Sequence, residues 1–240
     1  MGKGGDVEMG IPGALYPNMM ESPQMRWAFI RKVYSIVTLQ ILVTVAVSAV
    51  VVFYRPIPEF FQSRTTPAVA ALVLITISPF LVMLPMMFLR ERHPWNLIFL
   101  GLFTICISMV IGLACVTRSG KVIIEAAALT VVVVVGLTLY TFWAAKRGQD
   151  FNFLGPFLTA ALLVMMIYLI IQIFLPVGRV GTTIYGCLAA LVFAGFIIYD
   201  TDNLIKRHSY DEYVCASITL YLDIVNLFVS ILTVFSAADS

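Results

Sequence analysis

The chain has 240 residues, of which 61% are hydrophobic and only 12% are charged, and its formal net charge is +2. Soluble domains carry about 25% charged residues, so the composition excludes a soluble globular domain and predicts an all-α integral membrane protein. The small net charge, without a long run of lysine and arginine, argues against nucleic acid as a partner.

The chain is expected to begin with a flexible tail. Residues 1–26 are largely polar and rich in glycine and proline, and they show no sustained periodicity. We therefore predict a flexible cytosolic tail over 1–26, a transmembrane domain over 27–236 and a short C-terminal tail over 237–240.

Seven apolar runs follow the tail. Each has about 22 residues, which is enough to cross a bilayer as a tilted helix. They cover 33–54, 68–89, 95–116, 122–144, 153–175, 180–201 and 214–235. Pro79 and Pro85 fall inside the second run and predict a kink there. The last run contains Asp223 and Asn226, so we place it inside a seven-helix bundle as the central helix.

The basic residues predict the orientation. Ten lysines and arginines fall on the side of the N-terminus and five on the opposite side, which favours a cytosolic N-terminus by the positive-inside rule. A six-span alternative, with the last run re-entrant, would leave both ends cytosolic.

Three acids lie within the apolar runs. They are Glu125, Asp200 and Asp223; an ionisable side chain near a helix centre costs about 3 kcal/mol or more. If the last two helices form an antiparallel hairpin that turns near residues 210–212, Asp200 and Asp223 lie at similar depth. Two carboxylates that share a desolvated site cannot both ionise cheaply, so such a pair should respond to pH.

Each acid also has a simpler interpretation. Asp200 lies beside Asp202 and close to a loop, so it could be a helix-end acid near the headgroups. Glu125 could complement the helix dipole in the first turn of its helix. Alternatively, it could line the outer mouth of the cavity that contains Asp200 and Asp223. Together, the oxygens of Asp200 and Asp223 would also suit a hard cation such as Ca²⁺.

Arg90 ends the second run on the same side as Asp200. An arginine pairs well with a carboxylate, although an interfacial arginine that obeys the positive-inside rule needs no such partner. Hydroxyl side chains within the runs are expected to bond neighbouring helices. They are Thr104, Ser108, Thr130, Thr138 and Thr141.

The chain lacks several enzyme signatures. No G-x-S-x-G, H-E-x-x-H or P-loop pattern occurs, and the two histidines, His93 and His208, both lie at loops. We therefore expect neither an enzyme nor a bound cofactor.

Three segments carry a resemblance to a known family. They are Phe-Ile-Arg-Lys-Val-Tyr at 29–34, Phe-Ala-Gly-Phe-Ile-Ile-Tyr-Asp-Thr at 193–201 and Ala-Ser-Ile-Thr-Leu-Tyr-Leu-Asp-Ile-Val-Asn-Leu-Phe at 216–228. In these segments the chain resembles the transmembrane Bax inhibitor motif family, and most closely its plant LIFEGUARD branch.

The resemblance implies seven helices with the last one enclosed by the others. It also implies a calcium leak across internal membranes and the suppression of programmed cell death, with calcium, protons and other cell-death membrane proteins as partners. Asp200 and Asp223 map onto a pH-responsive pair, and Arg90 onto its latch. We expect the endoplasmic reticulum, with Golgi, vacuole or plasma membrane as alternatives. A scaffold protein without ion conduction is the competing function.

Overall fold

The computed structural model describes residues 13–17, 19–63, 65–89, 94–175 and 178–239. In these residues the fold is all-helical, with eight α-helices, one short 3-10 helix and no strand. The elements in chain order are α1 Pro23–Phe53, α2 Pro56–Gln62, α3 Thr66–Leu89, α4 Trp95–Val116, α5 Gly120–Lys146, α6 Leu154–Phe174, α7 Arg179–Lys206, η1 Tyr210–Glu212 and α8 Tyr213–Asp239.

Seven helices of the described chain are long and apolar enough to cross a membrane. They are α1 and α3 to α8, and they coincide with the seven predicted runs, so the predicted fold is confirmed and the chain is a multi-pass membrane protein. Because the seventh run forms the continuous helix α8, the re-entrant alternative is not supported. Helix α3 continues through Pro79 and Pro85.

The largest difference from the predicted boundaries is at the start of α1. This helix begins at Pro23, inside the segment predicted as a tail, and Arg26, Leu15 and Met19 are all buried. Residues 1–12, the rest of that predicted tail, lie outside the described residues. The turns of α1 before its apolar run are stabilised by side-chain contacts that hydropathy does not report.

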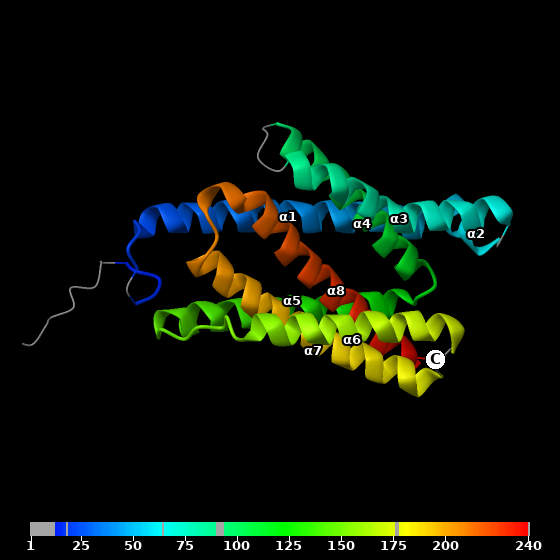
Figure 1. Ribbon diagram of the computed structural model, residues 1–240. Coiled ribbons are helices and arrows are strands. Elements are labelled where there is room, and N and C mark those ends of the chain that lie inside the picture. The colour runs from blue at the N-terminus through cyan, green and yellow to red at the C-terminus, as the bar shows by residue number, and fades with distance from the viewer. Residues whose placement is uncertain (1–12, 18, 64, 90–93, 176–177, 240) are drawn as a thin grey trace, which may run out of the picture.

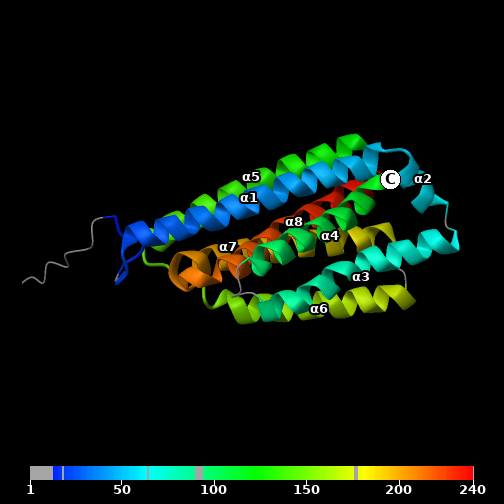
Figure 2. The same cartoon turned by 90° about the horizontal axis from the view of Figure 1, so that it is seen from above.

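Helix α8 runs through the middle of the bundle (Figures 1 and 2). It packs against α7, α5, α1 and α4. Half of the residues in its apolar stretch are buried, compared with at most a third in any other span. The helix that carries Asp223 and Asn226 is thus the one best shielded from lipid, as its composition requires.

Local signals explain several helix ends. Pro23 occupies the first turn of α1, where the missing backbone N–H costs nothing. Ser119 precedes α5 and its hydroxyl accepts a hydrogen bond from the backbone N–H of Val122. Gly148 follows α5 with a φ of 77°, the left-handed conformation that ends a helix at low cost only for glycine.

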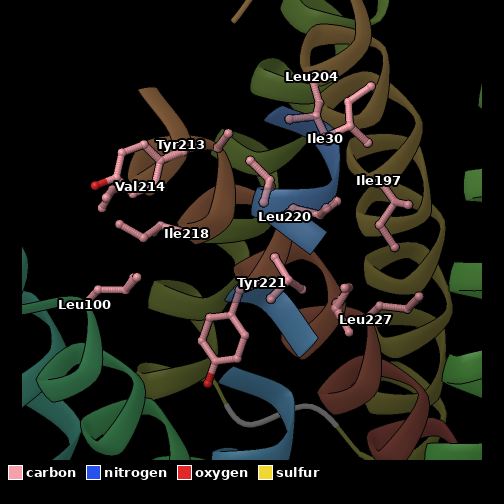
Figure 3. Close-up of a cluster of buried hydrophobic side chains, with 14 of the residues drawn as sticks. Ile30, Leu100, Ile197, Leu204, Tyr213, Val214, Ile218, Leu220, Tyr221 and Leu227 are labelled. Carbon is pink, nitrogen blue, oxygen red and sulfur yellow. The ribbon is translucent and has the colours of Figure 1, made fainter. Parts of the chain in front are cut away.

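The apolar core gathers around α8 (Figure 3). Tyr221 and Leu227 of α8 are fully buried and belong to the same cluster as Ile30 of α1, Leu100 of α4 and Ile197 of α7. This packing holds α7 and α8 together over the length that contains both aspartates.

A chain of hydroxyl contacts joins α1, α4 and α8 through the core. The Thr44 hydroxyl lies 2.7 Å from the Tyr221 hydroxyl, and Ser108 donates to Thr44 over 3.1 Å. Gln40 donates to Thr104 over 3.0 Å. Thr104 and Ser108 therefore bond a neighbouring helix, as predicted.

Two other hydroxyls that were predicted to bond neighbouring helices donate within their own helix. Thr130 and Thr141 each donate to the carbonyl oxygen four residues earlier in α5. Thr138 interacts with Tyr34 of α1. Sequence alone cannot separate these cases, because a threonine in a helix always has its own i−4 carbonyl within reach.

Substituting Gly112 should test the close contact between α1 and α4. A Cβ at this position would lie 2.8 Å from the Cβ of Val51, a buried and β-branched side chain that cannot swing away. We expect Gly112→Ala to lower stability by about 1–3 kcal/mol through overpacking, measured as thermal unfolding in detergent. Gly101→Ala on the same helix is the control, because nothing lies within 4 Å of its Cβ. Equal melting temperatures for the two variants would contradict the predicted contact.

Candidate functional site

The site is centred on Asp200 of α7 and Asp223 of α8. The two helices form an antiparallel hairpin whose turn is η1, Tyr210–Glu212, at the predicted position. The carboxyl groups of Asp200 and Asp223 face each other closely enough for a hydrogen bond between them. The pair inferred from helix depth is therefore present in the fold.

A close approach of α7 to α8 supports this pairing. A Cβ on Gly186 of α7 would lie 2.8 Å from Val234 and 3.1 Å from the carbonyl oxygen of Ser230. Only glycine permits this spacing. Helices α7 and α8 are therefore in close contact near the open end of the hairpin as well as at its turn.

The pair has few other polar neighbours. Asp223 is only 7% exposed, and its Oδ2 has no hydrogen-bond partner among the described residues. Asp200 is half-buried and also interacts with the side chains of Asn203 and Thr219, and with the charge of His208. An acceptor oxygen that is buried without a partner is costly, and a proton or a cation would satisfy it.

The predicted latch, Arg90, lies outside the described residues, which resume at Pro94. Its role therefore stays a prediction. Helix α3 ends at Leu89, immediately before it.

Glu125 lies away from the aspartate pair, near the start of α5. Its carboxylate is 3.8 Å from the Lys121 amine, and its side chain is 50% exposed. The structure thus gives it a surface ion pair one helical turn away, which is worth little in a polar setting.

A charged cluster that the sequence analysis missed surrounds Asp202. This residue is completely buried, lies 2.5 Å from Lys206 and 3.0 Å from Arg207, and accepts a bond from the backbone N–H of Phe151. Arg207 also pairs with Asp150 in the loop between α5 and α6, and its hydrogen bond lowers the pKa of Asp150. The cluster fixes the end of α7 against that loop, just beyond Asp200.

A second missed cluster surrounds Arg26 at the start of α1. Its guanidinium donates to both oxygens of Glu21 at 2.7 Å and to the backbone oxygen of His208 at 2.6 Å. It also lies over the rings of Phe29 and Tyr210. The Tyr210 hydroxyl donates to Glu21 over 2.5 Å, and this bond, with a smaller contribution from Arg26, lowers the pKa of Glu21.

Both clusters flank the hairpin that carries the aspartate pair. One holds the end of α7, and the other holds the turn between α7 and α8. Lys206 and Arg207 entered the sequence analysis only as orientation signals. The one available cue was the spacing of four residues between Asp202 and Lys206, which suits a helical ion pair.

No group of three or more histidine, cysteine, aspartate or glutamate side chains suited to a metal occurs among the described residues. Ca²⁺ takes six to eight oxygen ligands. The two carboxylates and the Thr219 hydroxyl offer at most five, because Asn203 Oδ1 accepts from Arg207, so these residues do not complete a calcium site.

Comparison with known proteins gives consistent matches over almost the whole chain. The family model described as Inhibitor of apoptosis-promoting Bax1 matches residues 26–240. Protein LIFEGUARD 4 of Arabidopsis thaliana is 56% identical over 98% of this chain and 96% of its own length. Protein LIFEGUARD 2 of the same plant is 55% identical over 94% of each chain. The Golgi anti-apoptotic protein of Vaccinia virus (strain Lister) is 35% identical over 91% of this chain and 89% of its own.

Proposed function

The chain belongs to the family described as Inhibitor of apoptosis-promoting Bax1, and from this premise we propose that it is a pH-sensitive, calcium-permeable leak channel that modulates programmed cell death. The observation that carries the proposal is the buried pair of Asp200 and Asp223 on the central hairpin. Acids inside a membrane bundle are costly, and they usually serve ion or proton pathways.

The pair would act as a proton-sensitive gate. With one carboxylate ionised, the negative site attracts a cationic partner, and Arg90 is the partner we propose from its place in the sequence. Together the pair and Arg90 would hold the cytosolic mouth of the channel shut. Protonation removes the negative charge, weakens the attraction to Arg90 and opens this mouth. Acidification should therefore raise the flux.

Calcium is the proposed permeant ion because two carboxylates lie together at the site. Carboxylate and hydroxyl oxygens from Asp200, Asp223 and Thr219 lie there, and hard cations prefer oxygen ligands. Because the pair offers few ligands and Asp200 is partly exposed, we expect a calcium ion to pass the site rather than bind tightly to it.

The proposed cellular setting follows from the relatives and from the charge pattern. One relative bears the name Golgi anti-apoptotic protein, which supports a role in cell death at an internal membrane. We propose the endoplasmic reticulum, with the N-terminus cytosolic because ten of fifteen basic residues lie on that side.

Calcium flux into liposomes that contain the purified full-length chain tests the proposal. We expect entry above that of protein-free liposomes, with an increase as the pH falls from about 8 to 5, the range in which shifted carboxyl pairs titrate. Flux equal to the protein-free background at every pH would refute conduction and leave the scaffold function. Saturable uptake that depends on a second solute would instead indicate a transporter.

A further inference from the structure

An apolar cavity opens between α1 and α5, and α4 and α8 complete its lining. Its volume is about 430 Å³. Helices α1 and α5 run alongside each other here, and α8 packs against both (Figures 1 and 2). Residues that line it include Phe53 of α1, Cys115 of α4, Ala127 of α5 and Phe228 of α8.

The cavity is lined almost entirely by apolar side chains, and its few hydroxyl groups have no free proton to donate to water. Its three hydroxyl side chains are Thr44, Ser48 and Thr130. Each already donates to a backbone oxygen, at Gln40, Ser108 and Ala126 respectively. Apolar cavities of about 150 Å³ stay dry and bind benzene, so this larger one suits an extended hydrocarbon.

The length of the cavity matches one leaflet. Along α1 it extends from Ile41 to Phe53, which is roughly 18 Å of helix. Half of a bilayer core is about 15 Å. An acyl chain that enters at the end of α1 would thus reach the middle of the bundle.

Exposed basic residues lie at the end of α1, where the acyl chain would enter the cavity. Arg55 follows α1, Lys121 begins α5, and Arg118 lies between α4 and α5. Arg118 interacts electrostatically with Cys115, which lines the cavity. Of the acids at this end, Glu125 is paired with Lys121, Asp239 contacts Ser119, and Glu59 lies one helical turn after Arg55 in α2.

We propose that this cavity binds one acyl chain of an anionic phospholipid, with the headgroup against Arg118 and Arg55. The apolar lining favours a hydrocarbon chain, and the length of the cavity suits an acyl chain that spans one leaflet. The two guanidinium groups favour a negatively charged headgroup. This proposal does not rest on the aspartate pair or on the proposed conduction.

Native mass spectrometry of the full-length protein tests this site, with phosphatidylglycerol and phosphatidylcholine titrated separately. The wild type should bind one phosphatidylglycerol more tightly than phosphatidylcholine. Ala127→Trp should fill the cavity and weaken binding about tenfold or more, which corresponds to 1.4 kcal/mol. The matched control is Ala128→Trp, at the next residue of α5, which does not line the cavity; it should bind as the wild type does.

The charge is tested by combining Arg55→Gln with Arg118→Gln. Both positions are exposed, so the fold should be kept. We expect phosphatidylglycerol to lose its advantage while phosphatidylcholine binds as before, and Arg31→Gln at the other end of α1 to change nothing. Equal binding by the two tryptophan variants would overturn the cavity as the site, and equal affinity of the wild type for both lipids would overturn the anionic preference.

Discussion

Asp223→Asn should abolish the pH dependence of calcium flux through the reconstituted protein. The amide has the shape of the carboxyl group but cannot ionise, so Asp200 would no longer share its site with a second titratable group. Coupling energies between sites are typically about 1–3 kcal/mol, or roughly a 5- to 150-fold change in an equilibrium. We expect the calcium flux of the wild type to change by a factor in this range between about pH 8 and 5, and the flux of the variant to stay constant.

Matched variants separate the pair from other titrating groups. Asp211→Asn changes an exposed acid in η1 and should leave the profile intact. His208→Asn tests the histidine that lies near Asp200, because histidine is the side chain that ordinarily titrates in this range; the response should persist. Loss of the response in His208→Asn with its retention in Asp223→Asn would assign the sensor to the histidine.

Arg90→Ala extends the same experiment to the proposed latch. Without the cationic partner, flux should be high at every pH from about 8 to 5, because ionisation of the pair no longer closes the mouth. If Asp223→Asn and Arg90→Ala both leave the flux and its pH profile unchanged, the gating mechanism is wrong.

Glu21 and Asp150, two of the surface acids with lowered pKa values, do not contribute to the pH dependence of the flux in this range. The Tyr210 hydroxyl, and then Arg26, lower the pKa of Glu21 below its ordinary value of 4.5, and Arg207 lowers that of Asp150 below 3.8. A group whose pKa is depressed by folding adds stability above its unfolded pKa and loses it as the pH falls through the folded value. Both contributions are therefore intact throughout the flux experiment.

Arg26→Met should cause a large loss of stability. The Arg26 side chain is 3% exposed and pairs with a Glu21 side chain that is 38% exposed. Breaking a buried pair costs about 3–5 kcal/mol; because Glu21 is partly solvated, we expect about 2–3 kcal/mol. In a chain of this size each kcal/mol corresponds to about 2–4 °C in the melting temperature.

Arg31→Met is the control for this substitution, because Arg31 is exposed on the same helix. Thermal unfolding in detergent should show a clear drop for Arg26→Met and little change for Arg31→Met. Glu21→Gln should have a smaller effect, since Arg26 keeps its bond to the carbonyl oxygen of His208. An unchanged melting temperature for Arg26→Met would show that the cluster does not hold the hairpin turn.

The depth of the aspartate pair was accessible to sequence reasoning, while its surroundings were not. Counting residues on either side of the turn at 210–212 placed Asp200 and Asp223 at one level, and η1 forms there. The facing of the two carboxyls depends on helix rotation, which close packing at Gly186 and the core around Leu227 stabilise. Hydropathy reports neither contact.

Buried charges were misjudged for the same reason. Arg26 contributed to the sequence analysis as one more basic residue beside the membrane, and Asp202 as a neighbour of Asp200 close to a loop. In the fold both are almost fully buried. Ion pairs with nearby residues and one backbone group from a distant segment, the His208 carbonyl oxygen for Arg26 and the Phe151 N–H for Asp202, replace their water. Hydropathy treats a charge as solvated, so it cannot anticipate a partner 51 or 182 residues away.

The sequence by itself determined the membrane class, the seven spans and the central place of the last helix. A spanning segment must form its backbone hydrogen bonds internally and can carry few charges. Composition and the length of the apolar runs therefore predict these features. Only the tertiary structure decided which polar groups meet: the facing of Asp200 and Asp223, the clusters at Arg26 and Asp202, and the cavity between α1 and α5. Those features arise from helix rotation and side-chain packing between segments far apart in the chain, and local patterns do not encode them.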